Sequence, residues 1–282
     1  MKVVLITGAA SGLGWAIAQK CYLRGDALLL VDMNAQLLAE REAQLNGFDR
    51  DKSECRDGGE KSLGEKDNAR VAVRIGDITN AVFRTEMLRC VEEEFSGLDV
   101  LINNAGITHR SLVEATHPDV FNKVMAVDWQ APVALAMEAL PLLERSKGTI
   151  INIGSMAGWM PVIGRAAYCS AKAALSQFFE VLRCEVKEKG IHILNVYPSF
   201  LETPIERNAL GGDGKPAMHP RSTTGTMRSA EWMAGIILDG EIRRKPWIFP
   251  DRLSWFASCL WRLWPRQYLR MMSKRFASEL IH

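Results

Sequence analysis

The sequence TGAASGLG occupies residues 7–14, directly after the apolar run VVLIT at residues 3–7 and directly before a helical pattern. Glycines let the chain turn sharply and approach a bound molecule closely, and the amino end of the following helix presents N–H donors and a positive dipole end. This turn is therefore suited to holding a pyrophosphate. Its spacing is not the usual G-x-G-x-x-G, and three glycines in such a turn are weak evidence when taken alone.

Asp32 strengthens the nucleotide interpretation. It ends the second apolar run, where a carboxylate can accept hydrogen bonds from the ribose hydroxyls of an adenosine. The same carboxylate would repel a 2′-phosphate, and neither Ser11 nor Met33 offers a basic side chain to bind one. The sequence therefore predicts NAD as cofactor in preference to NADP. The alternative is that Asp32 caps the helix that starts near Asn34 and Ala35.

Short apolar runs alternate with longer helical patterns. The runs fall at residues 3–7, 27–32, 71–77, 98–104, 148–155 and 191–198, with a short seventh at 246–249. The helical patterns fall at 13–24, 35–45, 81–95, 120–143 and 166–189. This alternation is typical of a parallel sheet with right-handed crossovers and helices on both faces. We predict an α/β fold, a Rossmann-like doubly wound seven-stranded sheet, in one domain over residues 1–250.

Three segments depart from this alternation. Residues 49–68 are charged and almost devoid of apolar side chains, which predicts a solvated surface insertion. Residues 199–226 follow the sixth apolar run and become rich in Gly, Pro, Ser and Thr from residue 208. Loops at the carboxyl ends of parallel strands surround the ligand crevice, so we expect a substrate lid there. We expect residues 251–282 to form a separate C-terminal helical extension.

Composition excludes several classes of function. The net charge of +2 gives no overall field that would attract nucleic acid. The six cysteines are scattered without a C-x-x-C pair, which argues against a structural metal site or a disulfide framework. The chain opens directly on a strand-like run, and no stretch approaches 18 consecutive apolar residues. We therefore expect a cytoplasmic protein without a bound metal.

Tyr168 and Lys172 lie four residues apart at the start of a helical pattern, so both side chains share one helix face. A lysine close to a phenol favours the phenolate and lowers the phenol pKa, which makes proton transfer easier. Ser155 ends the fifth run, where its hydroxyl can bind a carbonyl oxygen. The sequence NNAG at residues 103–106 ends the fourth run with small residues that permit close approach to a cofactor. Each motif is modest, and Y-x-x-x-K alone also describes an ordinary surface pair.

In this order and on these elements, the motifs resemble the short-chain dehydrogenase/reductase family over residues 1–205. The resemblance implies strand order 3-2-1-4-5-6-7 and hydride transfer between a nicotinamide and a substrate carbon. It implies that Ser155 polarises the carbonyl, that Tyr168 is the acid/base, and that Lys172 binds the nicotinamide ribose. The cofactor-binding residues that we expect are Gly8, Ser11, Gly12, Leu13, Gly14, Asp32, Asp77, Ile78, Asn104, Ala105, Gly106, Tyr168, Lys172, Pro198 and Thr203.

The sequence departs from the family pattern at two positions. Where the family usually has an asparagine that helps hold a water beside the active lysine, this chain has Asp128. We count Asp128 among the catalytic residues, as an acceptor in an altered proton relay. An ionised Asp128 could instead weaken the help that Lys172 gives to Tyr168. The second departure is Ser199, which follows Pro198 where the family commonly has glycine.

The substrate side and the C-terminal extension are less defined. Trp159 and the apolar residues near it are expected to line the crevice, which suggests a lipophilic alcohol or ketone. In the extension, Arg262, Arg266, Arg270 and Lys274 recur every four positions among aromatic and aliphatic residues. Such a helix could lie at a membrane interface as a peripheral contact, and Pro265 would start a helix or kink one. We favour the alternative that the extension covers the substrate pocket or packs on a second subunit.

These observations lead to one main hypothesis: an NAD(H)-dependent oxidoreductase that interconverts a lipophilic secondary alcohol and its ketone, with Ser155, Trp159 and Tyr168 contacting the substrate. A non-catalytic dinucleotide-binding sensor or assembly protein is the alternative, which Asp128 keeps open. Another reaction on the same scaffold, such as epimerisation or dehydration, is a third. The resemblance further implies a homodimer or homotetramer.

Overall fold

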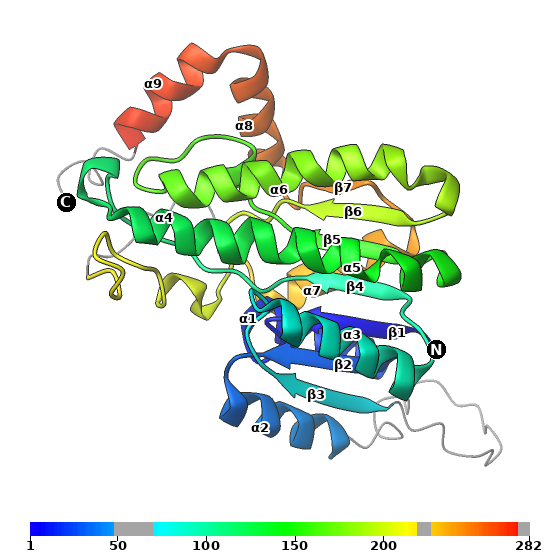
Figure 1. Cartoon of the computed structure of the whole chain (residues 1–282). Helices are drawn as coiled ribbons and strands as arrows, with labels where there is room; N and C mark the ends of the chain where they lie inside the picture. The colour runs from blue at the N-terminus through cyan, green and yellow to red at the C-terminus, as the bar shows by residue number, and fades with distance from the viewer. Residues whose placement is uncertain (48–69, 219–226, 276–282) are drawn as a thin grey trace, which may run out of the picture.

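A computed structural model of the chain describes residues 1–47, 70–218 and 227–275. Its centre is a parallel sheet of seven strands in the order β3-β2-β1-β4-β5-β6-β7 (Figure 1). The strands are β1 (Val3–Thr7), β2 (Ala27–Asp32), β3 (Val71–Ile75), β4 (Val100–Asn103), β5 (Thr149–Ile153), β6 (His192–Val196) and β7 (Trp247–Ile248). The central strands are almost wholly buried because helices cover both faces of the sheet. The predicted fold and strand order are confirmed.

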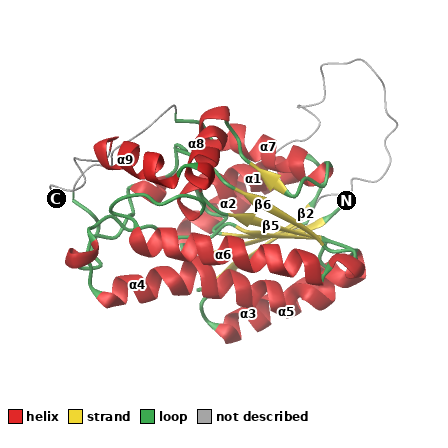
Figure 2. Ribbon diagram, turned by 90° about the horizontal axis from the view of Figure 1, so that it is seen from above, coloured by secondary structure: helices red, strands yellow, loops and turns green. Residues whose placement is uncertain are grey.

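Helices form a layer on each face of the sheet (Figure 2). One layer contains α1 (Gly12–Leu23), α2 (Ala35–Asn46) and α7 (Ala230–Ile242), and the other contains α3 (Ala81–Phe95), α4 (Pro118–Met125), α5 (Ala131–Ser146) and α6 (Ala166–Glu185). Side chains at the helix starts satisfy free backbone N–H groups: Asn34 caps α2, Asn80 caps α3 and Ser229 caps α7. Each layer buries its own apolar core against the sheet.

The helical stretch after β4 differs from the single helix expected at 120–143. It runs from Pro118 to Ser146 and contains a π-helical turn, Ala126–Gln130, between α4 and α5. Pro132 has no N–H, so the carbonyl of Asp128 cannot receive its usual α-helical hydrogen bond. The helix widens at this point and places Asp128 in the interior, where it is fully buried.

The described chain ends in two helices, α8 (Arg252–Leu263) and α9 (Pro265–Arg275). They form a hairpin that stands away from the sheet, at the top of Figure 1. Proline fits the first turn of a helix because an N–H there has no partner within the helix. Pro265 accordingly starts α9, which is one of the two outcomes that the sequence left open.

Two predictions concern segments that the structure describes in part or not at all. The surface insertion at 49–68 lies outside the described residues, and so do residues 219–226 of the expected lid. The rest of the lid contains a 3₁₀ turn, η6 (Pro204–Glu206), and is held by backbone pairing of Leu210 with His109. Within the described residues, no helix has both the length and the apolarity needed to cross a membrane.

Candidate active site

The glycine turn joins β1 to α1 at the carboxyl edge of the sheet. Gly8 and Gly12 adopt φ angles of 65° and 54°, which favour glycine. A Cβ on Gly14 would overlap the carbonyl oxygen of Gly8, so the backbone itself fills this space. The side chain of Asn104 donates hydrogen bonds to the carbonyls of Thr7 (2.9 Å) and Gly8 (3.0 Å). The NNAG motif therefore holds the turn closed from the neighbouring strand.

The start of α1 fits a pyrophosphate. Ser11 stands at the N-cap position in extended backbone, and within residues 1–47 its side chain makes no capping hydrogen bond. The first N–H groups of α1, including that of Leu13, are therefore not satisfied by this side chain. A helix amino end that carries free N–H groups and a positive dipole end favours a bound anion. These residues fit a dinucleotide cofactor.

Asp32 is tied to the same turn. One carboxylate oxygen accepts from the N–H of Ala10 (3.0 Å), and the other accepts from the N–H of Asn34 (2.9 Å). The helix cap is Asn34, whose side chain accepts from the N–H of Leu37. The alternative that Asp32 caps α2 is therefore wrong. Asp32 instead stands half-buried beside the turn, where a ribose would come within reach of its oxygens.

Asp77 and Ile78 follow β3 at the same edge. The carboxylate of Asp77 accepts from the N–H of Thr79 (2.8 Å). Ile78 is buried, and its carbonyl accepts from Arg84 (2.9 Å). Both residues are positioned by the backbone of this short loop, which leaves part of the Asp77 carboxylate for another partner.

The proposed catalytic residues come from three elements. Tyr168 is the third residue of α6, and Lys172 follows one turn later with its Nζ 5.9 Å from the centroid of the tyrosine ring. Lys172 Nζ donates to the carbonyl of Ile153 at the end of β5 (3.1 Å) and lies 3.4 Å from Oδ2 of Asp128. A Cβ on Gly106 would lie 3.4 Å from both side chains. The NNAG motif, the π turn, β5 and α6 thus meet at one point.

The ion pair of Lys172 and Asp128 is almost completely enclosed, with side chains 5% and 0% exposed. Asp128 also accepts the N–H of Ile107 through Oδ1 (2.7 Å). Burial raises the pKa of Asp128, while the Lys172 charge and the Ile107 N–H act in the opposite direction. Asp128 therefore pairs with the lysine charge through Oδ2 and accepts a hydrogen bond from the loop that follows β4 through Oδ1.

The pKa of Tyr168 is raised, chiefly by burial and next by the charge of Asp128. Hydrogen bonding with Ser155 and the charge of Arg165 lower it, and the charge of Glu206 raises it. The sequence led us to expect that Lys172 would lower this pKa. The protein residues alone do not produce that result, chiefly because burial disfavours the charged phenolate and next because of the nearby Asp128 charge.

Ser155 and Trp159 belong to the loop between β5 and α6, residues 154–165. Ser155 caps η4 (Met156–Gly158) by accepting the N–H of Ala157 (3.1 Å). Trp159 packs edge-on against Tyr197 and Phe249, with ring centroids 5.2 Å and 5.4 Å away. Its ring therefore fastens the loop to the body of the protein, and its contact with substrate stays a prediction.

Pro198 and Thr203 lie at the base of the lid. The carbonyl of Pro198 accepts the N–H of Met156 (3.1 Å), which ties the two loops together. The side chain of Thr203 stands 3.2 Å from the place that a Cβ on Gly12 would occupy, so the lid contacts the glycine turn. Ser199 donates to Asp251, directly before α8 (2.8 Å).

One polar cluster was not foreseen. Glu206 in the lid accepts from Arg110 and from Arg165, each at 3.0 Å, and Arg165 also donates to Thr108 (2.9 Å). Arg165 immediately precedes α6 and is three residues from Tyr168. Nothing local in the sequence marks this cluster, because the partners lie 96 and 41 residues apart.

Comparisons with known proteins agree with this architecture. The family model for short chain dehydrogenases matches residues 36–212. The rat protein named dehydrogenase/reductase SDR family member 7B is 31% identical over 98% of this chain and 82% of its own length. A Drosophila protein, SDR family protein 7-like, is 33% identical over 97% of this chain and 80% of its own. The chain therefore belongs to the short-chain dehydrogenase/reductase family and is an oxidoreductase with a Rossmann-like nucleotide-binding fold.

Solved structures share the fold. A short-chain dehydrogenase from Sphingobium yanoikuyae in complex with NADPH superposes with a TM-score of 0.73 at 24% identity, covering 97% of this chain and 96% of the other. An alcohol dehydrogenase from Thermococcus sibiricus complexed with 5-hydroxy-NADP gives a TM-score of 0.67 at 21% identity, covering 84% and 88%. At these identities the likeness concerns the fold alone.

Proposed function

We propose that this protein is an NAD(H)-dependent dehydrogenase that interconverts a lipophilic secondary alcohol and its ketone. The observation that carries the proposal is the position of Ser155, Tyr168 and Lys172. They gather at the carboxyl edge of the sheet that also bears the glycine turn. A substrate carbon held between Ser155 and Tyr168 would therefore lie on the same edge as a cofactor that begins at α1.

In this proposal the residues of the chain transfer the alcohol proton and bind the substrate oxygen. The nicotinamide, when bound, supplies hydride exchange at the substrate carbon. The Ser155 hydroxyl donates to the substrate oxygen and orients it. Tyr168 takes the alcohol proton during oxidation and returns it during reduction. Lys172, held by Ile153 and Asp128, keeps a positive charge one helical turn from the phenol.

The preference for NAD is supported by the surroundings of Asp32. Its carboxylate is fixed beside the glycine turn by two backbone N–H groups, so a 2′-phosphate there would meet a fixed negative charge. Arg41 lies near, but its Nε donates to the Ala10 carbonyl (3.1 Å) and its guanidinium lies over Trp15. Two solved relatives of the fold were studied with NADP-type cofactors, so cofactor choice is a property to measure here.

Asp128 supports a second candidate, a non-catalytic dinucleotide-binding sensor. After burial, the charge of Asp128 is the next cause that raises the pKa of Tyr168, so less of the phenolate that accepts the alcohol proton is present at neutral pH. A protein that only binds the dinucleotide would not need an easily ionised tyrosine. We retain the enzyme as the main proposal because Ser155 and Lys172 are both present.

The family resemblance also leads us to propose a homodimer or homotetramer. We place the interface on α5 and α6, which carry the exposed apolar side chains of Met137 and Val181.

The deciding experiment follows NADH absorbance with the purified chain, NAD or NADP, and a panel of lipophilic secondary alcohols and ketones. We expect turnover with NAD, and a Tyr168→Phe variant should lose about 10²–10⁴-fold in kcat while still binding NADH, because only proton transfer is removed. Tyr22→Phe, at the far end of α1, is the matched control. NADH binding without turnover of any alcohol or ketone would refute the enzyme and favour the sensor.

A further inference from the structure

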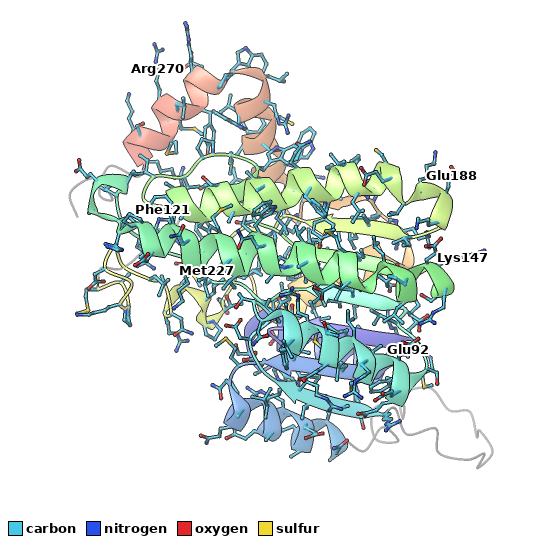
Figure 3. The ribbon with its side chains drawn as sticks, in the orientation of Figure 1. Glu92, Phe121, Lys147, Glu188, Met227 and Arg270 are labelled. Carbon is cyan, nitrogen blue, oxygen red and sulfur yellow. The ribbon has the colours of Figure 1, made fainter. Side chains whose placement is uncertain are left out.

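The hairpin of α8 and α9, residues 252–275, is strongly basic. It contains Arg252, Arg262, Arg266, Arg270, Lys274 and Arg275 and no acidic residue. The whole chain carries a net charge of only +2, so the rest of the protein is net negative. Figure 3 shows the side chain of Arg270 projecting from α9 away from the body of the molecule. Within the described part of the chain, Arg266, Arg270 and Lys274 form no salt bridge.

The same hairpin exposes large apolar side chains. Seven of the nineteen that are exposed in the described residues lie here: Leu253, Trp255, Phe256, Leu263, Trp264, Leu269 and Met271. Phe256, Leu263 and Trp264 are each 60% or more exposed. Scattered single apolar residues are normal on a protein surface, but this concentration on two helices marks an interaction site.

The inner face of the hairpin is already occupied. The Tyr268 hydroxyl donates to the carbonyl of Pro161 (3.0 Å), in the loop that also carries Ser155. The guanidinium of Arg262 lies 4.3 Å from the ring centroid of Trp159 in the same loop. Tyr268 and Met272 are buried. The hairpin therefore packs on the loop that carries Ser155, which agrees with the expectation that the extension covers the substrate pocket but does not test it, and its outer face still needs a partner.

We propose that the outer face of this hairpin binds the surface of a lipid membrane that contains anionic headgroups. Tryptophan, phenylalanine and leucine partition into the boundary between headgroups and acyl chains, and arginine and lysine pair with anionic headgroups above them. Long basic side chains keep their charge at the surface while their stems pass along apolar atoms. The hairpin offers both features on helices too short to span the bilayer.

The charge of the hairpin argues against a second copy of the chain as its partner. A two-fold interface brings the same surface from each copy face to face. Two hairpins would then bring Arg266, Arg270 and Lys274 of each copy to one interface, and such juxtaposition of like charges disfavours association. An anionic bilayer complements this surface, whereas a second hairpin repeats its charge.

Membrane binding would place the substrate loop directly beneath the lipid surface, because Tyr268 and Arg262 connect the two. A lipophilic alcohol or ketone could then pass from the bilayer to Ser155 and Tyr168 without crossing bulk water. This consequence rests on the proposed function, whereas membrane binding itself does not.

The test is co-sedimentation of the full-length chain with vesicles of phosphatidylcholine, alone or with a quarter of phosphatidylglycerol. We expect binding to the anionic vesicles and at least tenfold weaker binding to the neutral ones. The Arg266→Gln/Arg270→Gln variant should bind anionic vesicles on the order of tenfold more weakly. Leu263→Ser/Trp264→Ser should lose binding to a similar extent.

Matched controls carry the same changes elsewhere on the surface. Arg89→Gln/Arg145→Gln removes two exposed charges, and Ile75→Ser/Val82→Ser removes two exposed apolar side chains. Both should bind like the parent chain. NADH binding, measured by fluorescence, verifies that each variant is folded and does not depend on turnover.

Two results would overturn the proposal. One is the absence of sedimentation with anionic vesicles by a chain that binds NADH. The other is a chain that forms a dimer by light scattering, loses the dimer in Leu263→Ser/Trp264→Ser, and does not bind vesicles. The partner of the outer face would then be a second copy of the chain. Vesicle binding by a chain with no dehydrogenase activity would support the membrane site and refute only the proposed function.

Discussion

The nucleotide side and the substrate side of this molecule are built in different ways. The nucleotide side is fixed by backbone: Gly14 packs on the carbonyl of Gly8, and Asp32 is held by two N–H groups. The substrate side is fixed by side chains that join distant loops, such as Glu206 with its two arginines and Tyr268 with the loop before α6. The first side therefore tolerates little change, whereas the second can change its specificity one side chain at a time.

The largest effect on NADH affinity should follow the addition of one carbon atom to the glycine turn at Gly14. In Gly14→Ala, the new Cβ would overlap the Gly8 carbonyl and stand 2.5 Å from Asn104 Nδ2. Such overpacking costs about 1–3 kcal/mol, and the turn must open to relieve it. We expect NADH affinity, measured by fluorescence titration, to fall at least about 100-fold, which corresponds to about 2.7 kcal/mol.

Gly97→Ala is the matched control, because a Cβ there meets no described atom within 4 Å. Thermal unfolding of both variants separates loss of binding from loss of fold. Unchanged NADH affinity in a folded Gly14→Ala variant would show that the turn is more adaptable than its contacts indicate.

Removing the negative charge of Asp32, beside the glycine turn, should have the next largest effect. In Asp32→Ser, a hydroxyl can still accept the Ala10 N–H, but the negative charge that faces the ribose is gone. We expect the ratio of kcat/KM for NAD to that for NADP to fall about 10–100-fold, which corresponds to about 1.4–2.7 kcal/mol. Glu40→Gln on the exposed face of α2 is the control for net charge. A parent chain that already prefers NADP would contradict the role given to Asp32.

The residues of the candidate site could be predicted from the sequence, whereas one feature of the helix before β5 could not. The glycine turn, Ser155, Tyr168 and Lys172 were found because each motif is short and the strand or helix beside it places its side chains. The structure brings them to one edge of the sheet, as the resemblance implied. The π turn was missed, since its cause is a single proline, Pro132, inside an otherwise regular apolar pattern.

Long-range contacts could not be predicted. Glu206 meets Arg110 across 96 residues, and Tyr268 meets Pro161 across 107. No local periodicity encodes such pairs, because they depend on how loops cross after the sheet has formed. The effect of Asp128 on Tyr168 is of the same kind, since it depends on a buried charge whose position only the structure defines.

Asp128 lies where the two sides meet, and its removal should change the pH profile. Its charge raises the pKa of Tyr168, so Asp128→Asn should lower that pKa. The variant also leaves the Lys172 charge unopposed, which acts in the same direction. The rise of alcohol oxidation with pH should then move to lower pH by about one unit. The amide oxygen can still accept the N–H of Ile107 and preserve the loop.

Rates measured across pH test this shift, with Asp119→Asn on the exposed surface of α4 as control. Turnover equal to or above that of the parent with an unchanged pH profile would rule out a special role for the carboxylate. A shift to higher pH would mean that Asp128 assists ionisation of the tyrosine through the lysine.

The smallest effect should come from the substrate side, where one side chain connects the lid to the core. In Glu206→Gln the charge that Arg110 and Arg165 share is lost, while the amide can keep one hydrogen bond. The arginine side chains are only 5% and 11% exposed, so the lost charge should cost at least about 1 kcal/mol, and KM for the alcohol should rise at least about fivefold with little change in NADH affinity. Glu202→Gln, an exposed neighbour in the lid, should leave KM unchanged. An equal loss of NADH affinity would show that the lid and the glycine turn act as one unit through Thr203 and Gly12, and the division into two sides would then fail.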